Sequence, residues 1–186
     1  MPSLPSVPAS CLRRALASLF VVLCATPLAV AQCTQTLHTP GPPGCDGAIR
    51  AVIAWDIDGA GPLQEVIVAG GDFEQIGGVA AKGVALWDPL TDAWYAMGGG
   101  VDGQVFALAI DASGALLVGG LFQTASGSVV NNVARFDGGY WSPLGTGVDE
   151  TVYSLAASPT GEVFAGGAFS MAGSVVAKRV ARFDGT

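Results

Sequence analysis

Three copies of one segment of nearly fifty residues make up most of this chain, and this repetition restricts the possible folds more than any other feature. The Gly-Gly pairs that begin at Gly70, Gly119 and Gly166 are 49 and 47 residues apart. In every copy an Asp preceded by Trp or Phe lies 15 residues after the Phe that follows the pair. The copies differ in length at one turn, which reads DPLTDAW in the first and DGGYW in the second. Constant spacing with one variable turn predicts similar units placed side by side.

Several residue types recur at equivalent positions of the repeat. They are Gly70, Gly71, Gly119, Gly120, Gly166, Gly167, Asp88, Asp137, Asp184, Trp94 and Trp141. A catalytic site is needed only once, so residues that recur with the architecture are expected to be structural. Paired Gly is expected to permit positive φ or a close approach between strands. Each Asp, together with the recurrent Asp102 and Asp149, is expected to accept hydrogen bonds from nearby backbone amides.

Each unit is predicted to contain four short strands. In the second unit the first strand is VFALAI, at residues 105–110, and the second is LLVGG, after the turn DASG. A Gly/Ser-rich connection leads to the third strand, NVARFD, and a tight turn leads to a fourth that begins at Trp141. Short strands with turns about every 8 to 12 residues indicate an all-β repeat array. Runs of consecutive apolar residues predict sheets that are buried on both faces.

A period in the forties with four strands per unit is typical of the blades of a β-propeller. In the first copy an apolar run leads into Gly70-Gly71, and Trp87-Asp88 is followed by Pro89 and then by Trp94, seven residues after Trp87. This pattern resembles the kelch repeat, which also forms the central domain of galactose oxidase. The resemblance implies blades of four antiparallel strands.

The later copies depart from the kelch pattern, with five residues from Phe136 to Trp141 and Phe in place of the usual Tyr. The copper chemistry of galactose oxidase is not carried over, because the chain lacks its set of histidines and its cysteine beside a tyrosine.

The units are expected at about 51–98, 99–146 and 147–186, after a Pro/Gly-rich lead-in at 32–50. The third copy stops inside the turn before its fourth strand. A propeller ordinarily has 4 to 8 blades, so about three blades predict an incomplete, open propeller. The interpretation favoured is a fragment of a longer repeat protein, and the alternatives are assembly with other copies or an open arc.

Residues 1–31 have the pattern of a secretory signal peptide. Arg13 and Arg14 precede an apolar run, which closes with the sequence A-V-A at Ala31. A membrane anchor is the alternative, but the run contains Pro27 and is shorter than the ~20 residues that span a bilayer. We therefore expect a secreted, periplasmic or cell-surface protein with no membrane span.

The charge of the chain argues against nucleic acid as a partner. The full sequence has a net charge of −7, and removal of the signal peptide leaves six basic side chains against 15 acidic ones. A surface this acidic repels phosphate backbones, and no basic patch interleaved with aromatic residues is present.

Two cysteines, Cys33 and Cys45, remain in the predicted mature chain. An even pair in an exported protein is most simply a disulfide. Zinc is the alternative, but His38 and Asp46 are the only further ligands nearby, and this segment does not supply a zinc ligand set.

Asp56 and Asp58 begin an Asp-x-Asp-Gly pattern that resembles the start of calcium-binding loops, including those of integrin-type propellers. Alternating carboxylates offer hard oxygen ligands to a hard cation. The pattern then fails at Ala60, where another oxygen ligand is expected. The alternative is a turn rich in Asp and Gly, longer than the turn at 111–114 of the next copy.

The sequence offers little for catalysis. His38 is the single histidine and lies in the lead-in, and no G-x-S-x-G elbow is present. Asp149 and Glu150 are adjacent, so on a strand they point to opposite faces and do not form a carboxylate pair. Arg135 and Arg182 occupy the position of Leu86 and are expected to be exposed or ion-paired.

These observations predict no catalytic residues, no bound cofactor other than possible calcium, and an exported, non-enzymatic binding or scaffolding domain. Its ligand, an unknown protein or carbohydrate, would bind the loops at one rim of the blades. One alternative is part of a carbohydrate-active kelch-type enzyme whose catalytic residues lie outside this chain. The other is a calcium-stabilised surface adhesion module.

Overall fold

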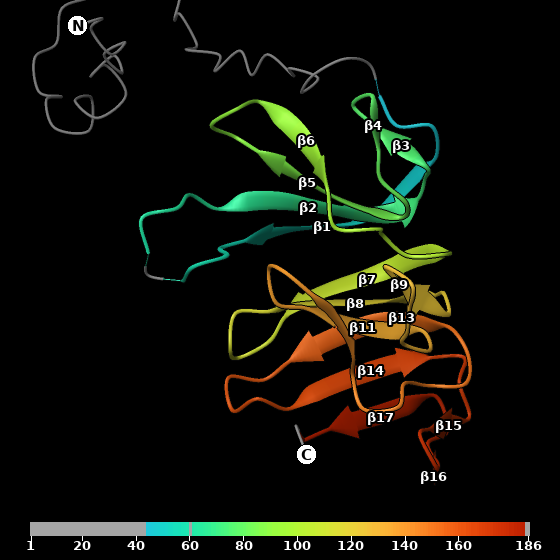
Figure 1. The fold of residues 1–186 in the computed structure, drawn as a ribbon. Coiled ribbons are helices and arrows are strands. Elements are labelled where there is room, and N and C mark those ends of the chain that lie inside the picture. Colours follow the sequence, from blue (N-terminus) through green and yellow to red (C-terminus); the bar gives the residue numbers. More distant parts are fainter. Residues whose placement is uncertain (1–43, 60, 185–186) are drawn as a thin grey trace, which may run out of the picture. The chain divides into compact units, whose positions relative to one another are not determined.

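The computed structural model describes residues 44–59 and 61–184, and these residues form three larger antiparallel sheets and three small two-stranded ones (Figure 1). No described residue lies in a helix, so the described part of the chain has no helix that could cross a membrane. The predicted signal peptide and Cys33 lie outside the described residues. The pairing of Cys33 with Cys45 therefore stays a prediction.

Each of the larger sheets corresponds to one copy of the repeat, and its strands lie in chain order. The first sheet contains β1 (Ala48–Trp55), β2 (Val66–Asp72), β5 (Val84–Asp88) and β6 (Ala93–Ala96). The second contains β7 (Gln104–Ile110), β8 (Leu116–Leu121), β11 (Val133–Phe136) and β12 (Trp141–Pro143). The third contains β13 (Val152–Ala157), β14 (Val163–Gly167) and β17 (Val180–Phe183). The prediction of an all-β fold built from blades of an incomplete propeller is confirmed.

A small hairpin interrupts the connection between the second and third strands of every sheet. These hairpins are β3 (Gln75–Ile76) with β4 (Val79–Ala80), β9 (Thr124–Ala125) with β10 (Ser128–Val129), and β15 (Met171–Ala172) with β16 (Val175–Val176). The sequence interpretation had only a Gly/Ser-rich connection here. Two-residue turns with positive φ, at Gly77-Gly78 and Ser126-Gly127, suit the twist of a tight hairpin.

The first strand of each sheet carries a β-bulge at the same place, which leaves Arg50, Phe106 and Tyr153 as the extra residues. β1 begins at Ala48, three residues before the predicted start of the first unit. Before it, Cys45 pairs with Ile76 of the small hairpin, as Val101 and Val148 pair with Ala125 and Ala172 in the other units. The first unit therefore reaches into the segment that the sequence assigned to the lead-in.

The two glycines of each pair are required for different structural reasons. A Cβ on Gly119 would lie 2.7 Å from Cγ1 of Val152 in the next sheet, so the first glycine allows the sheets to approach. A Cβ on Gly120 would overlap the carbonyl oxygen of Gln104, so the second allows the bulged strand to approach. The glycines of the three pairs are not among the described residues with positive φ, so close approach is the reason for them.

The two larger core clusters lie between the sheets, where their apolar faces meet. The larger cluster joins the first and second sheets and includes Trp55, Val68, Val84, Val105, Leu116, Val118 and Trp141. A second cluster joins the second and third sheets and includes Val133, Val152, Ala165 and Phe169. The second sheet is thus covered on both faces, which accounts for the uninterrupted burial of β8 from Leu116 to Gly120.

Candidate functional site

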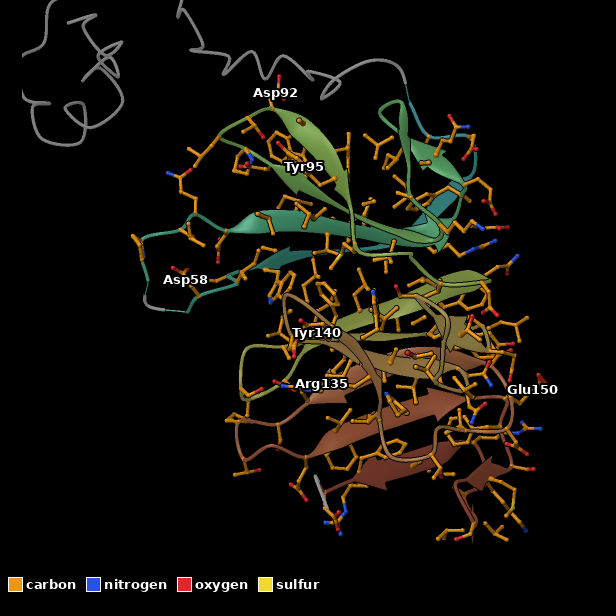
Figure 2. The ribbon with its side chains drawn as sticks, in the orientation of Figure 1. Asp58, Asp92, Tyr95, Arg135, Tyr140 and Glu150 are labelled. Carbon is orange, nitrogen blue, oxygen red and sulfur yellow. The ribbon has the colours of Figure 1, made fainter. Side chains whose placement is uncertain are left out.

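The antiparallel strand order places two sets of turns at one end of every sheet. This end, called here the turn rim, holds the turns between first and second strands, at 56–65, 111–115 and 158–162, and those between third and fourth strands. The opposite end, the hairpin rim, holds the small hairpins. Figure 2 shows Asp58 at the turn rim and Glu150 at the hairpin rim.

A pocket of about 660 Å³ opens at the turn rim between the second and third sheets. The turn after β7 contributes Asp111 and Ser113, and β11 contributes Arg135. From the third sheet, Arg182 and Phe183 of β17 line the opposite wall. These five residues, with Leu144 and Asp184 among the other lining residues, define the rim pocket.

The rim pocket lies where Asp111 stands at the position that Trp55 occupies in the first interface. The strand register makes Asp111 the equivalent of Trp55, since each lies four residues after the Ala that faces the first Gly of the pair. Trp55 is buried, and its ring centroid lies 6.0 Å from that of Phe136. At the second interface the pair is Asp111 and Phe183. A carboxylate fills much less space than an indole ring, so this replacement leaves room for the pocket.

An ion pair lines the rim pocket on the side of the second sheet. Nε of Arg135 donates to Oδ2 of Asp111 at 2.7 Å, and Nη2 donates to Oγ of Ser113 at 2.7 Å. The backbone amides of Ser113 and Ala115 donate to Oδ1 of Asp111. Burial raises the pKa of Asp111, but the hydrogen bonds from Ser113 and Arg135 outweigh it and hold this pKa below its ordinary value. Asp111 is therefore ionised at neutral pH.

The wall formed by the third sheet is more exposed. Nη1 of Arg182 donates to Oε1 of Glu162 at 2.8 Å, and more than half of the Arg182 side chain is exposed. Phe183 and Leu144 place apolar surface beside these charges. The rim pocket thus combines hydrogen-bond donors, hydrogen-bond acceptors and apolar surface, and each of its two guanidinium groups is paired with a carboxylate, Arg135 with Asp111 and Arg182 with Glu162.

The predicted calcium ligands lie in the long turn after β1. Oδ2 of Asp58 accepts a hydrogen bond from the amide of Leu63 at 3.1 Å. Oδ1 of Asp56 is buried and has no hydrogen-bond partner among the described residues. Within residues 44–59 and 61–184, no three His, Cys, Asp or Glu side chains form a group that could hold a metal ion.

The recurrent Asp residues bond to backbone amides. Oδ1 of Asp102 accepts from the amides of Gln123 and Thr124, both at 2.8 Å, at the start of the small hairpin. Asp149 holds the hairpin of the third unit in the same way, through the amides of Ser170 and Met171. These contacts tie each small hairpin to the strand that begins its own sheet.

The structure adds Asp46 to this set, because its Oδ1 accepts from the amides of Glu74 and Gln75, both at 3.0 Å. Sequence reasoning missed Asp46 because it fell in the assumed lead-in. The recurrence of Asp-Gly at Asp46 and Asp102 was the available signal. At the other rim, Asp137 accepts from the amides of Gly139 and Tyr140 within its turn.

The extra residues of the three β-bulges contact one another, which the sequence did not indicate. Cζ of Arg50 lies 5.1 Å from the ring centroid of Phe106. The rings of Phe106 and Tyr153 meet edge to face, with centroids 5.6 Å apart. The extra residue of each bulge therefore contacts the next, along the edge formed by the first strands.

The comparison with protein families agrees with the repeat architecture. Residues 112–138 match the family described as Domain of unknown function (DUF5122) beta-propeller. The match begins in the turn after β7, covers β8 and β11, and includes Ser113 and Arg135 of the rim pocket. No curated protein matches the chain. These findings support β-propeller-like repeats in this protein.

Proposed function

We propose that this protein is an exported, non-enzymatic binding domain of the kelch-like propeller type, and that it binds neutral carbohydrate in the rim pocket. The observation that carries the proposal is the pocket of about 660 Å³ that opens where Asp111 replaces an aromatic residue. Ligand sites are commonly concave surfaces of this size, with a few polar groups among apolar ones.

The chemistry of the lining favours a sugar over a charged ligand. Both of its guanidinium groups are already paired, Arg135 with Asp111 and Ser113 and Arg182 with Glu162. A neutral sugar presents hydroxyl groups that donate and accept, and its C–H face packs on apolar surface such as the Phe183 ring. The Ser113 hydroxyl donates to Asp111 and accepts from Arg135, an arrangement that positions groups and does not activate a nucleophile.

Export rests on the signal-peptide pattern of residues 1–31. The kelch assignment rests on the Gly-Gly pairs and on the Trp87-Asp88 segment of the first unit. Processing after Ala31 would be read from the N-terminal sequence of protein recovered outside the cytoplasm.

Binding is tested by NMR titration of the isotope-labelled full chain with glucose, galactose and N-acetylglucosamine at millimolar concentrations. We expect one or more of these sugars to shift the amide signals of Ser113, Leu144 and Phe183. A sugar that shifts signals elsewhere, or no shift with any of the three, contradicts the proposal.

A double variant, Asp111→Trp with Arg135→Leu, recreates the residues of the first interface, which carries Trp55 and Leu86. It fills the pocket without leaving a buried charge unpaired, so the fold is expected to persist while the sugar-dependent shifts disappear. Glu150→Gln at the hairpin rim is the control and is expected to keep them. Retention of the shifts in the filled variant would rule out this pocket as the site.

A further inference from the structure

The two ends of the stack of sheets expose residues whose equivalents are buried inside it. On the outer face of the third sheet, Phe164 is 41% exposed and Val180 is 63% exposed. The equivalent residues, which follow from the strand register, are all 0% exposed: Val68 and Leu117 for Phe164, and Val84 and Val133 for Val180. We call the surface around Phe164, Gly166 and Val180 the tail face.

The outer face of the first sheet shows the complementary pattern. Ile49 is 44% exposed and Val52 is 62% exposed. Val105 and Val152, the equivalents of Ile49, are fully buried. Leu108 and Leu155, the equivalents of Val52, pack into the cores between the sheets. We call the surface of Ile49 and Val52 the head face.

The molecule already contains this interface twice, which defines the partner that fits each exposed face. A Cβ on Gly70 would meet the side chains of Val105 and Leu108 of the second sheet. A Cβ on Gly119 would likewise meet Val152 and Leu155 of the third sheet. In both interfaces, therefore, a branched side chain and its neighbour cover the first glycine of the preceding sheet.

The third sheet has the same glycine without this cover. A Cβ on Gly166 would meet only atoms of its own unit, at Ser154 and Arg179. The head face carries residues of the required kind at the required positions, because Ile49 and Val52 are the equivalents of the pairs that cover Gly70 and Gly119. The head face and the tail face both belong to this chain but are different surfaces, so the head face of one copy can pack on the tail face of another.

We propose that the protein associates with a second copy of itself head to tail, with Ile49 and Val52 of one copy packed on Phe164, Gly166 and Val180 of the other. Such an interface is heterologous, so association either continues, with one free head face and one free tail face on each assembly, or stops when the copies close into a ring. Exposed apolar sheet faces of this kind are typical association surfaces.

The test uses two variants of the full chain, Val180→Asp in the tail face and Val52→Asp in the head face. Sedimentation velocity over a hundredfold concentration range is expected to show growth of the wild type in multiples of the monomer mass. Each variant alone is expected to stay monomeric, because one of its two faces is blocked. An equimolar mixture is expected to form dimers and nothing larger, since only one intact pair of faces is available.

Val176→Asp, at an equally exposed position of β16 outside both faces, is the matched control and is expected to assemble like the wild type. Circular dichroism checks the fold, and Val52→Lys and Val180→Lys serve if an Asp variant unfolds. A wild type that stays monomeric overturns the proposal and indicates that another partner covers these faces. A mixture that stays monomeric, or variants that still assemble alone, also overturns it.

Discussion

Gly120 illustrates how the absence of one side chain determines the geometry of a unit. It lies in β8 opposite the bulge of β7, where the carbonyl of Gln104 points at the position that a Cβ would occupy. Its neighbour Gly119 makes room for Val152 of the next sheet instead. Backbone atoms cannot move aside by a change of rotamer, whereas side chains can. Glycine is therefore required more strictly at the second position of each pair than at the first.

Gly120→Ala is expected to destabilise the protein by at least about 3 kcal/mol, the upper end of the usual range for overpacking. Gly139→Ala is the control, because a Cβ there would meet only the Asp137 carboxylate at 3.8 Å and its backbone is not in the left-handed region. We expect a change within about 0.5 kcal/mol for the control. Urea unfolding of both variants measures the difference, and similar losses would contradict this explanation of the pair.

Acid should weaken the structure through its recurrent carboxylates. Hydrogen bonds from the Met171 amide and from Ser170 lower the pKa of Asp149. Burial raises the pKa of Asp102, but hydrogen bonds from Thr124 and Gln123 outweigh it and lower the net value. A pKa that is lower in the folded state gives stability that is complete above the ordinary value of 3.8 and is lost as the pH falls through the folded value.

The free energy of unfolding is therefore expected to change little from neutral pH to about pH 5 and to fall steeply below about pH 4. Asp102→Asn combined with Asp149→Asn keeps a carbonyl acceptor for each hairpin but removes the titrating groups. We expect this double variant to be less stable at neutral pH and to lose stability less steeply in acid. Denaturant unfolding between pH 7 and pH 3 measures both slopes, and identical acid slopes would refute the assignment.

At the scale of elements, the small hairpins depend on contacts from outside their own strands. Each consists of two strands of two residues, too short to be stable alone. A carboxylate from the segment before the first strand bonds to two amides at the base of the hairpin, as Asp102 does for β9 and β10. The backbone bridge between Val101 and Ala125 adds a second connection.

Asp102→Ala should release the amides of Gln123 and Thr124, so their hydrogen exchange is expected to accelerate by at least about tenfold, as for the loss of a hydrogen bond to a charged acceptor. The amides of Ser170 and Met171 provide the control within the same molecule, because Asp149 still holds them. Amide exchange followed by NMR reads all four sites together. Equal acceleration in both hairpins would mean that the substitution acts on the whole fold.

The sequence predicted the four-strand unit but neither the hairpins nor the rim pocket. Gly-Gly spacing aligns the second and third strands of each unit correctly, because 49 and 47 residues separate their equivalent positions. Trp55 and Asp111, however, are 56 residues apart, since the turn after β1 is longer than the turn after β7. This insertion shifts the first strand out of the common period and conceals the equivalence of the two residues, which only the strand register reveals.

At the scale of the whole molecule, stability depends on contacts between neighbouring units. Among the described residues, apolar side chains pack between neighbouring sheets, and no single core cluster contains residues of all three larger sheets. Trp55 and Trp141 strengthen the first interface, where their indole nitrogens donate to the carbonyls of Gly114 and Met97 of the neighbouring unit. The second interface contains the rim pocket in place of Trp55, and we expect it to be the weaker of the two.

Leu117→Ala tests this expectation, because Leu117 is fully buried in the cluster that contains Val163 and Phe183 of the third unit. We expect a loss of about 2–5 kcal/mol and a separate, earlier unfolding transition of the third unit. Leu121→Ala in the same strand is the control, since Leu121 is 43% exposed. Calorimetry that shows one unchanged transition for Leu117→Ala would refute the nearest-neighbour description.

The unequal turns of the turn rim have a consequence for how such a protein diversifies. The turn after β1 spans 56–65, whereas its counterpart after β7 spans 111–115. The strands that these turns connect nevertheless pair in the same way, β1 with β2 and β7 with β8. Extra residues at this end extend into solvent and leave the interfaces unaltered. Insertions can thus accumulate in the turns of one unit without affecting the others. The loops of the turn rim can therefore vary, in evolution or by engineering, while the sheets stay the same.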